Sequence, residues 1–167
     1  MSTDLRQVVK HNLDVARRIL FVFEMKKRLD ELPRIFPRSL SPIRDFLSQR
    51  MDEVKDASLP LVLVFVASCL EHYLREKIPI EKKEKLGFKK LIERFRSSIG
   101  DKLAKDAHEM RIKRNIILHK AGVIDEKASK EFMKIGLTAY SVGDRLMLSE
   151  DEIRRYIDTC EKICNLI

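Results

Sequence analysis

The sequence of 167 residues is 44% hydrophobic and 36% charged, a balance that excludes a disordered chain and is enough for one domain with a buried core. Its formal net charge of +8 favours an anionic partner such as nucleic acid. A solvated basic surface would produce the same excess, so the charge alone does not decide the function.

The apolar segments of the sequence are too short to indicate a membrane protein. The longest apolar run covers residues 59–70, which is shorter than a membrane span, and the polar first residues do not resemble a signal peptide. Three cysteines are too few, and odd in number, for a disulfide framework. We therefore expect a cytoplasmic protein without a membrane segment.

The first half of the chain predicts three helices. Apolar residues at three- and four-residue steps predict a long helix over residues 4–32, followed by the connector "PRIFPRSLS". Ser41 with Pro42 predicts the start of a second helix that runs to about residue 55. Ser58 with Pro60 repeats that signal for a third.

The third predicted helix, residues 59–78, is apolar almost all round in its first half, which is typical of a central buried helix. Glu71 lies on its apolar stripe. A carboxylate in that position must be paired, bridged by water or protonated.

A strongly basic segment, residues 81–96, follows with a few apolar residues for an inner face. A solvated surface helix is the simpler interpretation, and a patch that contacts phosphates is the alternative. On the second interpretation Lys89, Lys90 and Arg94 are candidate substrate contacts.

Residues 101–122 predict one helix that begins at Asp101 and ends at Gly122. Arg114 falls in its apolar stripe, where a guanidinium needs a partner. Arg111, Asn115 and His119 follow at four-residue steps and share one polar strip, whereas Arg114 and His119 are about 140° apart around an ideal helix.

The C-terminal part predicts two further helices. Asp125 caps one that ends near residue 135, and the Ser149–Glu152 capping box begins another over residues 150–166. Between them, Gly143-Asp144 favours a turn. The prediction is a single all-α domain over residues 1–167, an up-and-down bundle of about six helices with, at most, one small β-hairpin near residues 138–148.

Several kinds of site have no support in the sequence. Cys160 and Cys164 share a helix face but lack a third ligand nearby, so we expect packing rather than metal binding. Glycine motifs for phosphate loops or dinucleotides are absent, and we expect no cofactor. His11, His72 and His108 fit structural or solvated positions better than catalytic ones.

Glu71, Arg114 and His119 allow two interpretations. In the structural one, Arg114 pairs with Glu71 inside the bundle and His119 simply ends a helix. In the functional one, they belong to a site that a straight helix cannot assemble alone, because Arg114 and His119 point apart. That site would need a distorted helix end or a second copy of the chain.

The segment "RNIILH", residues 114–119, resembles the Arg-x4-6-His motif of HEPN domains (higher eukaryotes and prokaryotes nucleotide-binding). The polar residue after the arginine, Asn115, matches a common form of this motif. "VFVASCLEHYL" resembles the helix that carries an acidic residue in this family, which corresponds to Glu71. "HKAGVIDE" and "VGDRLMLSEDEI" are similar to the region after the motif, so that the resemblance covers roughly residues 59–167.

This resemblance implies a homodimeric, metal-independent endoribonuclease in which two motif helices meet at a two-fold axis. The ribose 2′-hydroxyl attacks the adjacent phosphate and leaves a 2′,3′-cyclic phosphate. His119 would move protons, Arg114 would stabilise charge on the phosphate, and Glu71 would orient Arg114. Asn115 would position the phosphate or His119. The further candidate substrate contacts are Arg111, Lys113 and Lys120.

The expected role is cleavage of single-stranded or loop RNA in a toxin, defence or RNA-processing setting, with an antitoxin or another protein as a further partner. Ala121 stands where many toxin members have a tyrosine, which argues against that form of antitoxin control. The alternative is a non-catalytic dimeric module that binds nucleic acid, nucleotide or protein. A helical regulator of duplex DNA is a third, weaker alternative because no recognition-helix pair is evident.

Overall fold

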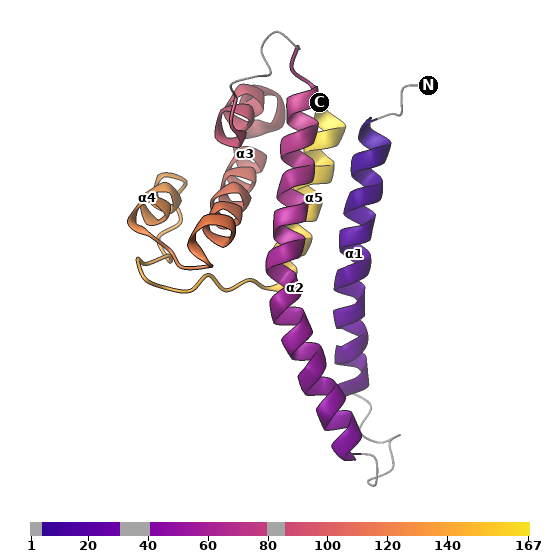
Figure 1. Ribbon diagram of the computed structural model, residues 1–167. Coiled ribbons are helices and arrows are strands. Elements are labelled where there is room, and N and C mark those ends of the chain that lie inside the picture. Colours follow the sequence, from indigo (N-terminus) through magenta and orange to yellow (C-terminus); the bar gives the residue numbers. More distant parts are fainter. Residues whose placement is uncertain (1–4, 31–40, 80–85) are drawn as a thin grey trace.

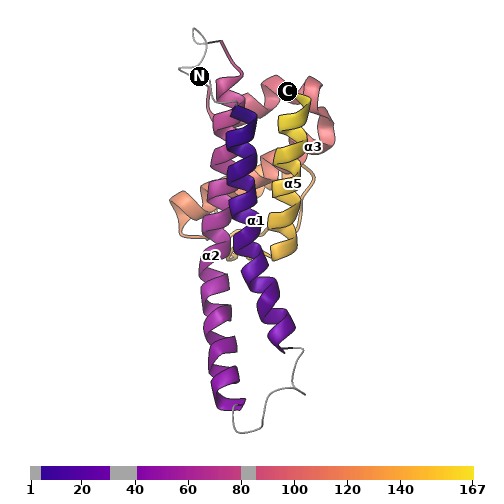
Figure 2. The ribbon, with the colours of Figure 1, turned by 90° about the vertical axis from the view of Figure 1, so that its right-hand side faces the viewer.

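The computed structural model describes residues 5–30, 41–79 and 86–167. This part of the chain contains five helices: α1 (Leu5–Asp30), α2 (Ser41–Glu76), α3 (Phe88–Lys120), α4 (Glu126–Lys134) and α5 (Glu150–Leu166). Helices α1, α2 and α5 pack on one another, α3 packs on α2 and α5, and α4 contacts α3 on its outer side (Figures 1 and 2). The predicted all-α class is confirmed for the described residues, although the predicted number of about six helices is not.

The main core lies where α1, α2, α3 and α5 meet. Its largest fully buried side chains include Tyr73 of α2 and Tyr156 of α5. The Tyr73 hydroxyl donates to the carbonyl of Cys164 at 2.9 Å, which satisfies a polar group that would otherwise be costly to bury. A smaller second cluster lies between α3 and α4 and contains Ile112, Ile116 and Phe132. The pocket that His119 lines lies over this second cluster.

The predicted break before residue 59 is wrong, because α2 continues through Pro60. Proline lacks the N–H that would donate to the carbonyl of Asp56, but Asp56 is exposed and water can satisfy that carbonyl. The hydroxyl of Ser58 donates to the carbonyl of Val54 at 2.6 Å and so does not cap a new helix. Packing against α1 along this region stabilises the continuous helix.

Helix α2 also contains one stretch, Ser48–Glu76, that is long and apolar enough to cross a membrane by length and composition alone. Half of its most apolar window is buried within the protein. The central helix of a globular bundle has the same properties, so this stretch is weak evidence for a membrane span.

The basic segment and the helix predicted over residues 101–122 are joined into α3 with a kink at Gly100, whose φ is 80° and ψ 160°. A residue with a side chain rarely adopts this conformation, so the glycine sets the point at which the helix changes direction. The carboxylate of Asp101 accepts a hydrogen bond from Arg96 Nε at 2.7 Å across the kink. Helix α3 ends at Lys120, and Ala121 and Gly122 both have positive φ, close to the predicted end at Gly122.

The small hairpin that the sequence allowed near residues 138–148 is not confirmed. The turn at Gly143 is present with a φ of 91° and includes a bond from Asp144 N–H to Ser141 C=O at 3.3 Å, but the chain beyond the turn then pairs with the α3–α4 connector. Leu146 N–H donates to Gly122 C=O at 2.8 Å, and Ile124 N–H donates to the carbonyl of Asp144 at 3.0 Å. This pairing fastens the C-terminal end of α3, which carries the candidate site, to the segment before α5.

Both predicted helix starts in the C-terminal part are confirmed. Asp125 caps α4 by accepting from the backbone N–H of Ala128 at 2.8 Å. At α5 the Ser149 and Glu152 side chains form the complete capping box. These caps satisfy N–H groups that have no partner within the helix, which is why the local sequence alone could place them.

Candidate functional site

Arg114 projects from α3 toward α2, where its Nη1 lies 3.2 Å from Glu71 Oε2. The other oxygen of Glu71 accepts from Arg75 Nη2 at 3.0 Å. The side chains of Arg114 and Glu71 are 22% and 18% exposed, so the pair is half-buried and remains reachable from solvent. Both interpretations of the sequence predicted this pair, so the pair alone does not discriminate between them.

His119 projects from another side of α3. With Asn115 and Lys120 it lines an open pocket of about 280 Å³ between the end of α3 and the start of α4. The buried side chains of Ile112 and Ile116 also line this pocket. Arg114 is not among its lining residues, as the five-residue spacing predicted. One chain therefore brings together Asn115 and His119 but not Arg114 and His119.

The mouth of this pocket carries both signs of charge. Lys120 Nζ lies 3.2 Å from Asp125 Oδ2, and both groups line the pocket. The N–H of Ala128 and then Lys120 hold the pKa of Asp125 below its usual value. Lys120 is half exposed, at 51%, so it could exchange Asp125 for a phosphate without crossing the core.

Arg111 belongs to a neighbouring cavity. It is buried, and its Nη2 donates to Glu131 Oε2 on α4 at 2.8 Å. The cavity has a volume of about 420 Å³ and lies against both halves of α3 and the end of α4. Glu131 lines this cavity as well as the His119 pocket, so the predicted strip of Arg111, Asn115 and His119 is divided between two adjoining depressions.

Lys113 requires a correction. We predicted a substrate contact, but its side chain is fully buried and paired with Glu109 at 3.0 Å and with Glu152. Its Nζ also lies 5.0 Å from the centroid of the Tyr140 ring. Burial by itself would lower the pKa of Lys113, but the acidic and tyrosine groups around it raise that pKa overall. An ammonium group held in this way has a structural role.

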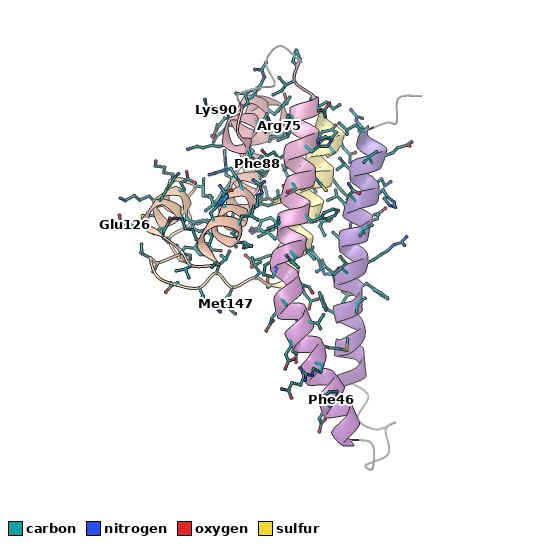
Figure 3. The ribbon with its side chains drawn as sticks, in the orientation of Figure 1. Phe46, Arg75, Phe88, Lys90, Glu126 and Met147 are labelled. Atoms are coloured by element: carbon teal, nitrogen blue, oxygen red, sulfur yellow. The ribbon has the colours of Figure 1, made fainter. Side chains whose placement is uncertain are left out.

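The predicted contacts of the basic segment lie in different places. Lys89 lines the cavity beside Arg111. Lys90 and Arg94 are exposed, and Figure 3 shows Lys90 at the outer side of the first part of α3. Lys82, Lys83 and Lys85, which contribute to the same basic segment, lie outside the described residues.

No known protein is available for comparison with the arrangement of Glu71, Arg114 and His119. The sequence matches no protein-family model, and comparisons with curated proteins and with solved structures find no match. What the site does must therefore be inferred from its own side chains.

One contact that sequence reasoning missed joins the two halves of α3. His108 is buried, and its Nε2 lies 2.8 Å from Glu93 Oε1. Burial lowers the pKa of His108 even though Glu93 acts to raise it, and the nearby positive charges of Arg111 and Lys89 add to the lowering. The signal in the sequence that could have indicated this contact was Gly100, which lies within the helical pattern. The kink at Gly100 brings His108 and Glu93 together.

The cysteines fit the prediction that they are packing residues. Cys160 and Cys164 are buried in the main core, where burial raises the pKa of Cys164 to about 12 and that of Cys160 well above its usual value. Across residues 5–30, 41–79 and 86–167, no group of three or more His, Cys, Asp or Glu side chains is placed to hold a metal ion.

Proposed function

We propose that this protein is a metal-independent endoribonuclease of the HEPN type that acts as a homodimer. The observation that carries the proposal is the ion pair between Glu71 of α2 and Arg114 of α3, together with the exposed His119 five residues beyond Arg114 in the last turn of α3. Glu71 holds the guanidinium in place and the pair stays partly open to solvent. An arginine held in this way is suited to stabilise charge that develops on a phosphate.

In the proposed reaction the ribose 2′-oxygen attacks the adjacent phosphorus. One histidine takes the 2′-hydroxyl proton while the new O–P bond forms, and a second histidine donates a proton to the 5′-oxygen as its bond to phosphorus breaks. Arg114 stabilises the additional negative charge on the phosphate oxygens. The products are a 2′,3′-cyclic phosphate and a 5′-hydroxyl, and no metal is needed.

A dimer is required because one chain separates Arg114 from His119. A two-fold partner supplies a second histidine and can place its own motif helix across the first. An exposed apolar face beside the pair supports this arrangement. Leu61 and Phe65 of α2 are 68% and 38% exposed, and Leu118, one turn beyond Arg114 on α3, is 48% exposed.

Helices α2 and α3 pack against each other and run in opposite directions (Figure 1). Arg114 contacts Glu71, and residues 121–122 line a pocket with Pro60. These two points fix how the end of α3 is aligned along α2. Leu118 therefore lies between these two points, near the turn of α2 that carries Phe65. These exposed apolar residues on two packed helices, close to the pair, are the ones that we propose to form the dimer surface.

The proposed substrate is single-stranded or loop RNA, in keeping with the net charge of +8. We further propose a cytoplasmic protein with a toxin, defence or RNA-processing role and an antitoxin or other protein partner. Ala121 argues against control through a tyrosine at that position.

The test is cleavage of a structured RNA in EDTA, followed by mass spectrometry of the 3′ ends. We expect 2′,3′-cyclic phosphate ends from the parent protein and at least a 100-fold lower rate from His119→Ala. His11→Ala is the matched control, since His11 is exposed on α1 and should retain full activity. Absence of cleavage by the parent, or cleavage by His119→Ala at the parent rate, would reject the catalytic assignment.

The alternative is a non-catalytic dimeric module that binds nucleic acid, nucleotide or a protein. It is favoured by the observation that Arg114 lies against Glu71 while His119 opens into a separate pocket. It predicts RNA binding that weakens steeply with salt, without turnover. The same EDTA assay, combined with a binding measurement, separates the two functions.

A further inference from the structure

The cavity beside Arg111 has the composition of an anion site. Five cationic and three anionic side chains line it, which leaves a surplus of two positive charges. Its volume of about 420 Å³ is in the range typical of small-ligand sites, about 300–1,000 Å³. It lies apart from the Glu71–Arg114 pair, and none of the catalytic roles proposed above uses it.

The acidic residues of this cavity are already engaged. Asp101 accepts from Arg96, and Glu131 accepts from Arg111. Glu93 contacts both His108 and Arg96. The carboxylates therefore neutralise the arginines, and the positive charge of Lys89 adds to the lowering of the Glu131 pKa without an ion pair between the two side chains.

Three lysines reach the cavity from three places in the fold. Lys89 comes from the first half of α3, Lys105 from the half after the kink, and Lys134 from the last turn of α4. Within the described part of the chain none of the three has a carboxylate within ion-pair distance. Three ammonium groups around one cavity, none of them in an ion pair with a described residue, repel one another, and a bound anion would reduce that repulsion.

Arg111 adds a fixed donor group to the same wall. Its side chain is 8% exposed, and Glu131 accepts only from Nη2. The Nε–H is buried without an acceptor among the described residues. An unsatisfied buried donor costs about 1–3 kcal/mol, so an oxygen brought by water or by a ligand would be favourable after a small rotation of the guanidinium.

We propose that this cavity binds a phosphate group, carried either by a small phosphorylated molecule or by the backbone of an RNA strand. A tetrahedral anion with several oxygens can accept from lysines that approach from different directions, which a planar carboxylate does less well. Arg111 and His119 are about 12 Å apart along an ideal helix, so an RNA strand in the His119 pocket could extend to this cavity.

The proposal does not depend on ribonuclease activity. Binding to the cavity needs neither a dimer nor His119, and a protein that failed to cleave RNA could still bind phosphate here. All binding measurements are therefore made on a His119→Ala background, which also keeps the RNA intact.

The first arm of the test measures pyrophosphate binding by isothermal titration calorimetry. The cavity variant carries Lys105→Ala and Lys134→Ala, and the matched control carries Lys102→Ala and Lys130→Ala. Each pair removes one lysine from α3 and one from α4, but Lys102 and Lys130 are exposed and do not line the cavity. We expect at least tenfold weaker binding in the cavity variant and less than a twofold change in the control.

The second arm measures binding of a 12-nucleotide single-stranded RNA by fluorescence anisotropy at several salt concentrations. Loss of two phosphate contacts should reduce the slope of log K against log salt by about 1.4, because each contact to a single strand contributes about 0.7. Thermal unfolding of all variants shows whether the fold is retained.

The two arms distinguish the sources of the phosphate. If the cavity variant loses pyrophosphate binding but keeps the RNA slope, the occupant is a small phosphorylated molecule. If the RNA slope falls, the occupant is the strand. If neither probe responds to the cavity substitutions, or if the control variant loses as much binding as the cavity variant, the proposal is rejected.

Discussion

Glu71 and Arg114, 43 residues apart in the sequence, form an ion pair of 3.2 Å between α2 and α3, and Arg75 binds the other carboxylate oxygen of Glu71. Two arginines thus share one half-buried acid. Removing the negative charge would take from both guanidinium groups the carboxylate that they share.

The first prediction is that Glu71→Gln lowers the free energy of unfolding by about 1–2 kcal/mol, as expected for a half-buried pair and less than for a fully buried one. If the proposed function holds, the same change lowers the RNA cleavage rate because Arg114 loses its orientation. Urea unfolding and the EDTA cleavage assay measure the two effects. Glu53→Gln is the control, since Glu53 pairs with Arg50 at an exposed position. Equal effects of both substitutions would show that the Glu71 position has no special importance.

The second prediction concerns the buried network around Lys113. Glu109, whose side chain is only 4% exposed, pairs with both Lys113 and Arg155. Lys113→Met removes the buried one of these two cations and should lower the free energy of unfolding by about 3 kcal/mol, the lower end of the range for a broken buried pair. Lys113→Met combined with Glu109→Gln should recover part of this loss, because the buried charge is then removed as well. Lys102→Met, at an exposed position of the same helix, should change stability by less than about 0.5 kcal/mol. Urea unfolding tests all three, and a stable Lys113→Met protein would show that the network is weak.

The third prediction is a pH dependence that comes from His108. Its pKa in the folded protein is lowered from the usual value of 6.5, chiefly by burial, with Arg111 and Lys89 adding to this and Glu93 opposing it. The unfolded chain therefore takes up a proton at this histidine before the folded chain does, so stability falls as pH drops below about 6.5. The loss continues until the folded pKa is reached.

His108→Gln should flatten this dependence between pH 7.5 and 5, a window above the range in which Glu93 titrates. Urea unfolding at several pH values gives the slope, and NMR titration of the His108 ring gives its pKa directly. A His108 pKa at or above 6.5 would contradict the predicted direction.

The fourth prediction is that Phe65→Glu prevents dimer formation. A carboxylate among the exposed apolar residues Leu61, Phe65 and Leu118, which we propose to form the dimer surface, would be desolvated in that interface without a partner. We expect a dimer from the parent protein and a folded monomer from the variant by light scattering coupled to gel filtration, with cleavage lost. Phe46→Glu is the matched control, because Figure 3 shows Phe46 at the end of α2 opposite Arg75. A monomeric parent protein would remove the basis for a composite site.

Local signals in the sequence were sufficient for the helix starts at Asp125 and Ser149 and for the end of α3 near Gly122, because caps and left-handed residues act within a few positions of the chain. The same holds for the separation of Arg114 from His119, which follows from helix geometry alone. The burial of Cys160 and Cys164 also followed from their apolar character.

Apart from the Glu71–Arg114 pair, only the tertiary structure decided which distant groups meet. Packing against α1 carries α2 through Pro60, and the α3–α4 connector takes the backbone partners expected from a hairpin. The kink at Gly100 joins His108 to Glu93 and shapes the cavity beside Arg111, while acids on α3 and α5 draw Lys113 into the interior. These outcomes depend on contacts between different helices and loops, and the free energy of those contacts outweighs local preferences. Such contacts produce no periodic pattern in the sequence from which they could be predicted.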